Sequence, residues 1–198
     1  MTPEEHINQI IENTFNVLSA IKNDEHQNSR LIFPKYRNQD TRYSEQELRF
    51  LFVEQFLQYC EKPENKECKD WLYSVETPTT YKYIFKNQNK PRKCKQGETG
   101  GESAQIDLVI HNKDNKRIAL VEFKAHNTSP FKFKKDFVKL KGEPKKALKY
   151  FVMYIDTIGP STISNLSVKF KKYINDSKIL FFCYDIDTGK RVDSKILE

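Results

Sequence analysis

The sequence predicts an α/β fold in which helices flank a mixed central sheet. Two helical patterns come first, strand patterns follow, and the chain ends in alternating helix and strand, an order typical of this class. A length of 198 residues suits one domain, or one domain with an extension. We expect residues 1–43 to form an N-terminal extension of helix and loop, and residues 44–198 to form the main domain.

The composition restricts the class of partner. The net charge is +7 and the pI is about 9.1, which favours a polyanion such as nucleic acid. The N-terminus lacks the features of a signal peptide, and no stretch reaches the roughly 18 apolar residues of a membrane span. Four cysteines at irregular spacings predict reduced thiols rather than a zinc site. Together these features predict a cytoplasmic protein with no membrane partner.

The first helix is predicted over residues 3–22, where isoleucine, valine and leucine recur at helical spacing. Thr2 and Glu5 supply a capping box, and Pro3 suits the first turn. The polar segment 23–42 is then expected to be a loop.

The second helix is predicted over residues 44–60, where Ser44 and Glu47 form another capping box. This helix is apolar on two sides, so we expect it to be covered on two sides. A narrow polar stripe with Glu47, Glu54 and Gln58 must then open on solvent or on a site. The second apolar side consists of Phe50, Val53 and Leu57.

Strand patterns follow the helices. Residues 71–76 and 80–86 predict two strands that join near Pro78, and a basic segment at 86–101 predicts a mobile loop. The clearest strand pattern is the hairpin at 104–126.

The last third of the chain alternates between helix and strand. A lysine-rich segment, 132–149, is expected to contain a helix around 134–140. A strand at 150–155, a helix at 161–174 and a strand at 178–185 complete the prediction.

A two-residue turn at 114–115 fixes the pairing within the hairpin. By symmetry about this turn, His111 faces Ile118 and Asp107 faces Glu122. Side chains alternate along a strand, so the hairpin has two faces. One face carries Asp107, Val109, Leu120, Glu122 and Lys124, and the other face, wholly apolar, carries Ile106, Leu108, Ile110, Ala119, Val121 and Phe123.

Two carboxylates that face each other across a hairpin repel, because their Cβ atoms lie about 5 Å apart. A divalent cation between Asp107 and Glu122 removes the repulsion, and hard oxygen ligands suit Mg²⁺, with Mn²⁺ as a substitute. Lys124 reaches the same place, where an amine can orient a metal-bound water and stabilise charge on a phosphate. The pattern therefore predicts a magnesium site for chemistry on a phosphate.

Asp107 followed by Glu122-Phe123-Lys124 resembles the signature of the PD-(D/E)XK nuclease superfamily, an acidic residue on one strand and then Glu/Asp-x-Lys on the next. The order of helix, three strands, helix and strand over residues 44–155 is also similar. The resemblance implies a restriction-endonuclease-like core, with a mixed central sheet between helices. Ile106 stands where the signature often has proline.

The resemblance implies a Mg²⁺-dependent nuclease of the restriction, defence or mobile-element type, which favours DNA as the substrate over RNA, although the sequence does not decide between the two. Asp107 and Glu122 would hold the metal, with the carbonyl of Phe123 as a third ligand, and Lys124 would position the attacking water. In-line attack on phosphorus leaves a 3′-hydroxyl and a 5′-phosphate. The sequence leaves open the sequence preference, endo- versus exonuclease action, and the oligomeric state, with a homodimer among the options.

In the same family an acidic residue of the preceding helix often joins the metal site. Glu47 is the first candidate for this catalytic role and Glu54 the second. Glu47 equally fits a purely structural role as the third helical residue of its capping box.

Clustered lysines predict a track for a phosphate backbone. The segment 132–149 holds eight lysines against two acids, and the basic loop provides a second track. The residues expected to contact nucleic acid are Lys93, Lys95, Lys132, Lys134, Lys135 and Lys139.

Each of these features has a plainer interpretation. Asp107, Glu122 and Lys124 fit a salt-bridge cluster on a solvated hairpin face, and the lysine run fits a solvated helix. The alternative function is a non-catalytic nucleic-acid-binding module with the same fold, which binds but does not cut. Structural or substrate-facing roles fit Glu76, Gln105 and His126, which lie near the site in sequence or strand order.

Overall fold

The structure is a computed structural model, and it confirms an α/β fold with a mixed central sheet. The described residues form four α-helices and an open sheet of seven strands. They comprise residues 1–23, 29–38, 41–42, 44–85, 91–125, 130–155, 159–174, 178–193 and 196.

The helices and strands alternate along the second half of the chain. The helices are α1 (Pro3–Lys22), α2 (Glu45–Cys60), α3 (Pro130–Gly142) and α4 (Pro160–Ile174), with a short 3-10 turn η1 (Lys66–Cys68). The strands are β1 (Leu72–Ile84), β2 (Arg92–Lys93), β3 (Glu102–His111), β4 (Arg117–Ala125), β5 (Leu148–Ile155), β6 (Leu180–Asp185) and β7 (Lys190–Arg191).

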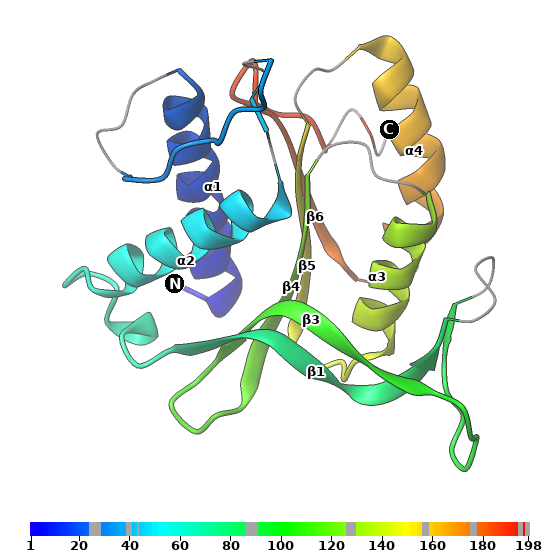
Figure 1. Cartoon of the computed structure of the whole chain (residues 1–198). Coiled ribbons are helices and arrows are strands. Elements are labelled where there is room, and N and C mark those ends of the chain that lie inside the picture. The colour runs from blue at the N-terminus through cyan, green and yellow to red at the C-terminus, as the bar shows by residue number, and fades with distance from the viewer. Residues whose placement is uncertain are drawn as a thin grey trace.

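The strand order in the sheet is β2-β1-β3-β4-β5-β6-β7. β4, β5 and β6 are parallel, because α3 and α4 connect them as crossover helices, whereas the remaining pairs are antiparallel. α1 and α2 cover one face of the sheet, and α3 and α4 cover the other (Figure 1). The far ends of β1 and β3 extend past α3 as an arm (Figure 1).

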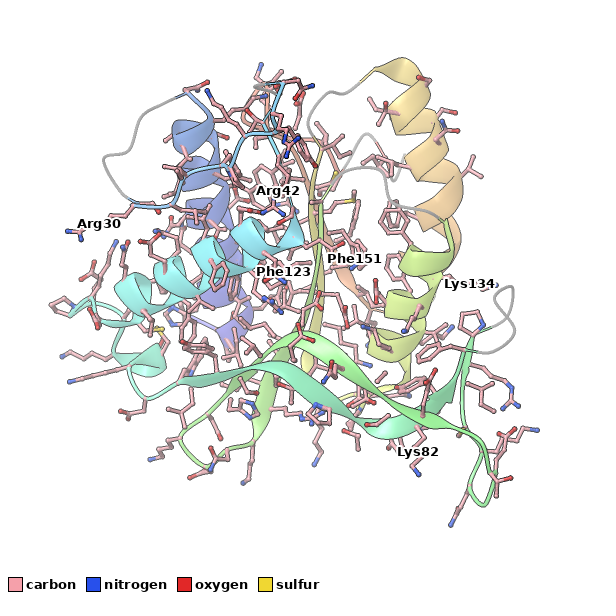
Figure 2. The ribbon with its side chains drawn as sticks, viewed as in Figure 1. Arg30, Arg42, Lys82, Phe123, Lys134 and Phe151 are labelled. Carbon is pink, nitrogen blue, oxygen red and sulfur yellow. The ribbon has the colours of Figure 1, made fainter. Side chains whose placement is uncertain are left out.

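Each face of the sheet has its own hydrophobic core. Phe123 points to the α2 side, where its ring lies 5.4 Å from that of Phe52, and Phe151 points to the α3 side, where its ring stacks on Phe137 at 4.6 Å (Figure 2). β5 is buried on both of its faces, so its sequence is an almost continuous apolar run.

The N-terminal helix packs into the core of the sheet. α1 begins at the predicted capping box, in which the Thr2 hydroxyl accepts from the Glu5 amide at 3.2 Å and the Glu5 carboxylate accepts from the Thr2 amide at 2.7 Å. Its apolar stripe, including Ile7, Ile10 and Leu18, belongs to the same core cluster as α2.

Three sequence predictions were wrong in detail. β1 is one long strand with an irregularity between Pro78 and Lys82, rather than two strands. The capping box at α2 does not form, because the Ser44 hydroxyl donates to the Glu47 carboxylate and leaves the backbone uncapped. The second apolar side of α2 is largely uncovered in the described structure, where Phe50 and Leu57 are exposed and only Val53 packs against the core.

The hairpin reaches the predicted register by a different turn. Asn115 adopts a positive φ of 59°, and Ile110 pairs with Ala119 whereas His111 pairs with Arg117, so Ile118 is an extra residue that forms a bulge. The bulge restores the predicted pairing from Ile110 onward, although the predicted partner of His111 was wrong.

The alternation of β3 breaks near Asp107. Leu108 and Ile110 share one face as predicted, and it packs against α1 and α2, but Ile106 packs on the α3 side. Glu76, the β1 residue beside this point, has a positive φ of 48°, which distorts the ladder.

The basic segment after β1 falls partly outside the described residues, namely at 86–90. Its described part contains β2, which pairs with the end of β1 through Tyr83 and Ile84. None of the helices in the described part of the chain is long and apolar enough to cross a membrane.

Replacing Phe151 with alanine is expected to lower the free energy of unfolding by about 3–5 kcal/mol, because the ring is fully buried. Urea unfolding measures the loss. The matched control is Phe50→Ala, whose ring is 61% exposed, so the change should be about 0.5 kcal/mol or less. Equal losses in the two variants would contradict this core.

Candidate active site

Asp107 lies where β3 and β4 separate. The regular pairing of the two strands ends at Leu108 and Val121. Beyond it, Oδ2 of Asp107 accepts a hydrogen bond from the amide of Phe123 at 2.8 Å, so a carboxylate replaces a carbonyl of the ladder. This bond fixes Asp107 beside the Glu122-Phe123-Lys124 segment, as the sequence predicted.

Glu122 is completely buried, which excludes a solvated hairpin face. Nζ of Lys139 lies 2.6 Å from its Oε1, yet neither carboxylate oxygen has a hydrogen-bond partner of good geometry among the described residues. Burial foremost, and then the charges of Asp136 and Asp107, raise the pKa of the Glu122 carboxyl well above its ordinary value.

Lys124 is also buried, and three oxygens surround its amine. Nζ lies 3.0 Å from Oδ2 of Asp136 and 3.3 Å from Oε2 of Glu45, and it donates to the carbonyl of Phe123 at 2.8 Å. Burial opposes the charge on this amine, but the carboxylates, Asp136 foremost, outweigh burial and raise its pKa. Lys124 is therefore an ammonium group at neutral pH.

Helix α3 contributes two buried side chains that the sequence interpretation did not place in the site. Asp136 bridges the two lysines, with Oδ1 at 2.8 Å from Lys139 and Oδ2 at 3.0 Å from Lys124. Lys139 also donates to the carbonyl of Gln105 at 2.8 Å. The sequence contains a pattern that could have predicted this pair. Asp136 and Lys139 are three residues apart and therefore share one side of a helix.

The acidic residue that α2 supplies to this group is Glu45, which corrects the choice of Glu47. The Glu47 carboxylate accepts from Arg42 at 3.0 Å and from Ser44, so its partners lie in the segment before the helix. Glu45 instead reaches Lys124. Burial raises the pKa of the Glu45 carboxyl, and Lys124 partly offsets this effect. Glu54 is not among the described residues that line the site.

A polar cavity of about 50 Å³ opens beside Asp107. Arg49 of α2 reaches it and is bound by Glu76 and Gln46. Glu76 has a positive φ, which strains the backbone of a non-glycine residue. Such strain is often found at functional sites. The described residues that line the cavity are Glu45, Gln46, Arg49, Glu76, Asp107 and Phe123.

The charges of this cluster do not balance. Four carboxylates, from Glu45, Asp107, Glu122 and Asp136, face the two ammonium groups of Lys124 and Lys139. When all are ionised, two negative charges are in excess. The two buried carboxylates, of Glu122 and Asp136, match the two buried lysines, and the excess comes from Glu45 and Asp107, which are half-buried. We call these six residues the acidic cluster.

The donor chemistry of the acidic cluster fits Mg²⁺ or Mn²⁺. Both ions take carboxylate and carbonyl oxygens, and Mg²⁺ commonly uses one or two carboxylates and keeps several waters. Asp107, Glu122 and the carbonyl of Phe123 supply such oxygens. No three His, Cys, Asp or Glu side chains in the described part of the chain are already arranged to hold a metal together.

The lysines expected to contact nucleic acid lie on the arm and on α3. Lys93 and Lys95 are exposed on the arm, where Nζ of Lys93 lies 3.0 Å from the centre of the Tyr81 ring. On α3, Nζ of Lys135 lies 4.3 Å from the centre of the Phe85 ring. Lys134 is half-buried on α3. Lys139 corrects the prediction, because it is buried in the acidic cluster and unavailable to a phosphate backbone. The side chain of Lys132 lies outside the described residues.

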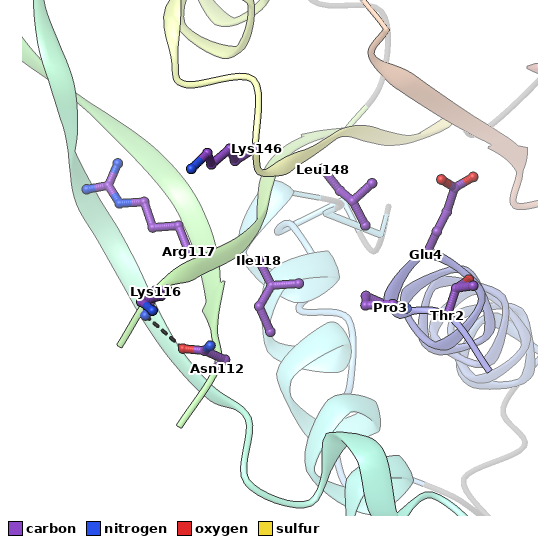
Figure 3. Close-up of a pocket in the computed structure, with 9 residues that line it drawn as sticks. All are labelled: Thr2, Pro3, Glu4, Asn112, Lys116, Arg117, Ile118, Lys146 and Leu148. Atoms are coloured by element: carbon purple, nitrogen blue, oxygen red, sulfur yellow. Dashed lines mark hydrogen bonds between the residues drawn. The ribbon is translucent and has the colours of Figure 1, made fainter. Parts of the chain in front are cut away.

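A larger groove, of about 520 Å³, lies at the other end of β4 and is a less suitable site (Figure 3). Its floor is apolar, with Pro3, Ile118 and Leu148. Arg117 at its rim is already bound to Glu143 at 3.0 Å. None of the described residues that line the groove is a fully buried carboxylate such as Glu122.

Comparison of the chain with protein-family models, curated proteins and solved structures finds no match.

Replacing Glu122 with glutamine is expected to raise the free energy of unfolding in the presence of a chelator, because burial raises the pKa of this carboxyl and its ionised form therefore destabilises the fold. The substitution lowers the excess negative charge of the cluster by one, and Lys139 keeps Asp136 as a partner. Urea unfolding at neutral pH measures the gain. The control Glu102→Gln changes an exposed residue and should have little effect. A loss of stability in Glu122→Gln would show that its pairing with Lys139 outweighs the charge excess.

Proposed function

We propose that the protein is a Mg²⁺-dependent nuclease that hydrolyses phosphodiester bonds in DNA, with the acidic cluster as its active site. The observation that carries the proposal is the fully buried carboxylate of Glu122, which lacks a hydrogen-bond partner in the described structure and sits among excess negative charge. Lys139 already pairs with Glu122, but the two lysines offset only two of the four carboxylates, so a further cation is needed. One divalent ion would cancel the excess.

Two further features support the proposal. Asp107 and the Glu122-Phe123-Lys124 segment lie side by side, which matches the strand arrangement of the PD-(D/E)XK signature. The order α2, β1, β3, β4, α3, β5 is also similar to the core of that superfamily. We therefore propose a restriction-endonuclease-like fold for residues 44–155, to which β2, α4, β6 and β7 are added.

Asp107 and Glu122 would hold the metal ion, together with the carbonyl of Phe123. When bound, Mg²⁺ supplies Lewis-acid polarisation of the phosphate and lowers the pKa of a coordinated water. The attacking water would lose a proton to solvent as its oxygen forms a bond to phosphorus, and the 3′-oxygen, whose bond to phosphorus breaks, would take up a proton from solvent. The products are a 5′-phosphate and a 3′-hydroxyl.

The charged state of Lys124 decides its role. An ammonium group cannot accept the proton of the attacking water, so Lys124 acts as a hydrogen-bond donor that orients the water and stabilises negative charge on the phosphate. Glu45 contacts Lys124 directly and holds the amine at the mouth of the site. Arg49, at the adjoining cavity, provides a second positive group near the phosphate.

The exposed lysines of the arm support a nucleic-acid partner. Lys93 and Lys95 extend beyond α3 and could contact a backbone without taking part in the chemistry. The same lysines favour the second candidate function, a binding module without catalysis. That candidate predicts salt-dependent binding and no cleavage with any metal.

Asp107→Ala and Lys124→Ala are each expected to abolish cleavage, because one removes a metal ligand and the other removes the group that orients the water. Plasmid DNA, single-stranded DNA and structured RNA are incubated with Mg²⁺, Mn²⁺ or chelator, and products are resolved on gels. Circular dichroism checks that each variant is folded. Full cleavage by either folded variant would overturn the assignment of the active site.

Glu45→Gln is expected to reduce the cleavage rate by about tenfold to a hundredfold, because Glu45 holds Lys124 from the adjoining helix. Glu47→Gln is the matched control two residues away, and it should leave the rate nearly unchanged. Initial rates with saturating Mg²⁺ compare the two variants. A larger loss in Glu47→Gln would restore Glu47 as the helix residue of the site.

A further inference from the structure

Lys139 is the cation that neutralises Glu122 in this structure. Its Nζ lies 2.6 Å from Oε1 of Glu122, 2.8 Å from Oδ1 of Asp136 and 2.8 Å from the carbonyl oxygen of Gln105. The Lys139 side chain is only 5% exposed, so these contacts lie in the interior. Three oxygens around one positive centre are the surroundings that a bound metal ion also prefers.

We propose that Lys139 is a built-in competitor for the divalent cation: it neutralises Glu122 in the free protein and gives up this carboxylate when a metal ion binds. The inference rests on the metal site proposed above and adds regulation to that site. It sets the affinity of the free protein for metal below the value that the carboxylates alone would produce.

The contacts of Lys139 allow this exchange without leaving a charge unpaired. When Glu122 is released, Asp136 and the carbonyl of Gln105 still hold the ammonium group. The lysine stem is flexible and its ammonium group is compact, so a small displacement is enough. Oε2 of Glu122 is already without a hydrogen-bond partner in the described structure, and it is the oxygen that a metal ion can approach first.

The exchange also accounts for the geometry of the ligands. No three potential ligand side chains converge in the described part of the chain, although Asp107 and Glu122 come from neighbouring strands. Lys139 belongs to α3 and draws the carboxylate of Glu122 to that helix. Removing the charge of Lys139 frees Glu122. It also removes the repulsion between the ammonium group and the metal ion.

The test is isothermal titration of the metal-free full-length protein with Mn²⁺. Lys139→Met is expected to bind Mn²⁺ about tenfold or more tightly than the wild type, because a unit positive charge beside the ion is gone. Lys141→Met is the matched control on α3, since it loses the same charge from an exposed position. It should bind as the wild type does. Equal or weaker binding by Lys139→Met would overturn the proposal.

Thermal unfolding keeps the proposal testable if Lys139→Met folds poorly. Without Lys139, Glu122 is a buried carboxylate without its direct ion-pair partner, so in chelator the variant should melt below the wild type. Mn²⁺ should then raise its melting temperature more than that of the wild type. A variant that folds only with Mn²⁺ supports the exchange. If Lys139→Met stays unfolded in saturating Mn²⁺ and Lys139→Gln binds no more tightly than the wild type, the proposal is wrong.

Nucleic-acid cleavage separates this inference from the proposed function. If the wild type cuts DNA with Mg²⁺ while wild type and Lys139→Met bind Mn²⁺ equally, the inference fails and the nuclease stands. If neither protein binds Mn²⁺ and the wild type does not cut, both fail. If Lys139→Met alone binds Mn²⁺, the competition by Lys139 is supported.

Discussion

The buried carboxylate of Glu122 is the constraint on which the rest of the candidate site depends. A carboxylate that is fully removed from water needs a positive partner. Helix α3 supplies the direct ion-pair partner, Lys139, and Asp136 then ties this lysine to Lys124 of β4, whose charge also acts on Glu122. The result is a charged interior between the sheet and α3, held in place by the aromatic core around Phe137 and Phe151.

Much of the fold could be predicted from hydrophobic periodicity. The helices and the parallel strands at the C-terminal end were predicted within a few residues, because their apolar patterns are long. The hairpin register also held, although its turn was wrong, because the bulge at Ile118 compensates for the longer turn. Local alternation failed where the backbone itself is irregular, at Ile106 beside the strained Glu76, and near Pro78 in β1.

The candidate site was predicted in part. Asp107 and the Glu122–Lys124 segment follow from strand pairing, which is a local property, but burial depends on which helix covers the strand. The choice between Glu45 and Glu47 depends on the rotation of α2, and a helix with two apolar sides does not reveal its rotation. The sequence predicts Lys139 as part of a basic surface. In a run of lysines, the sequence does not show which one is ion-paired inside the protein.

The central claim is that a divalent cation binds at Asp107 and Glu122. The most direct measurement is an anomalous diffraction map from crystals of the protein soaked in Mn²⁺. The account predicts one strong peak in contact with both carboxylates and the Phe123 carbonyl, with Nζ of Lys139 farther from Glu122 than 2.6 Å. If crystals soaked at saturating Mn²⁺ show no peak between these two carboxylates, the account is contradicted.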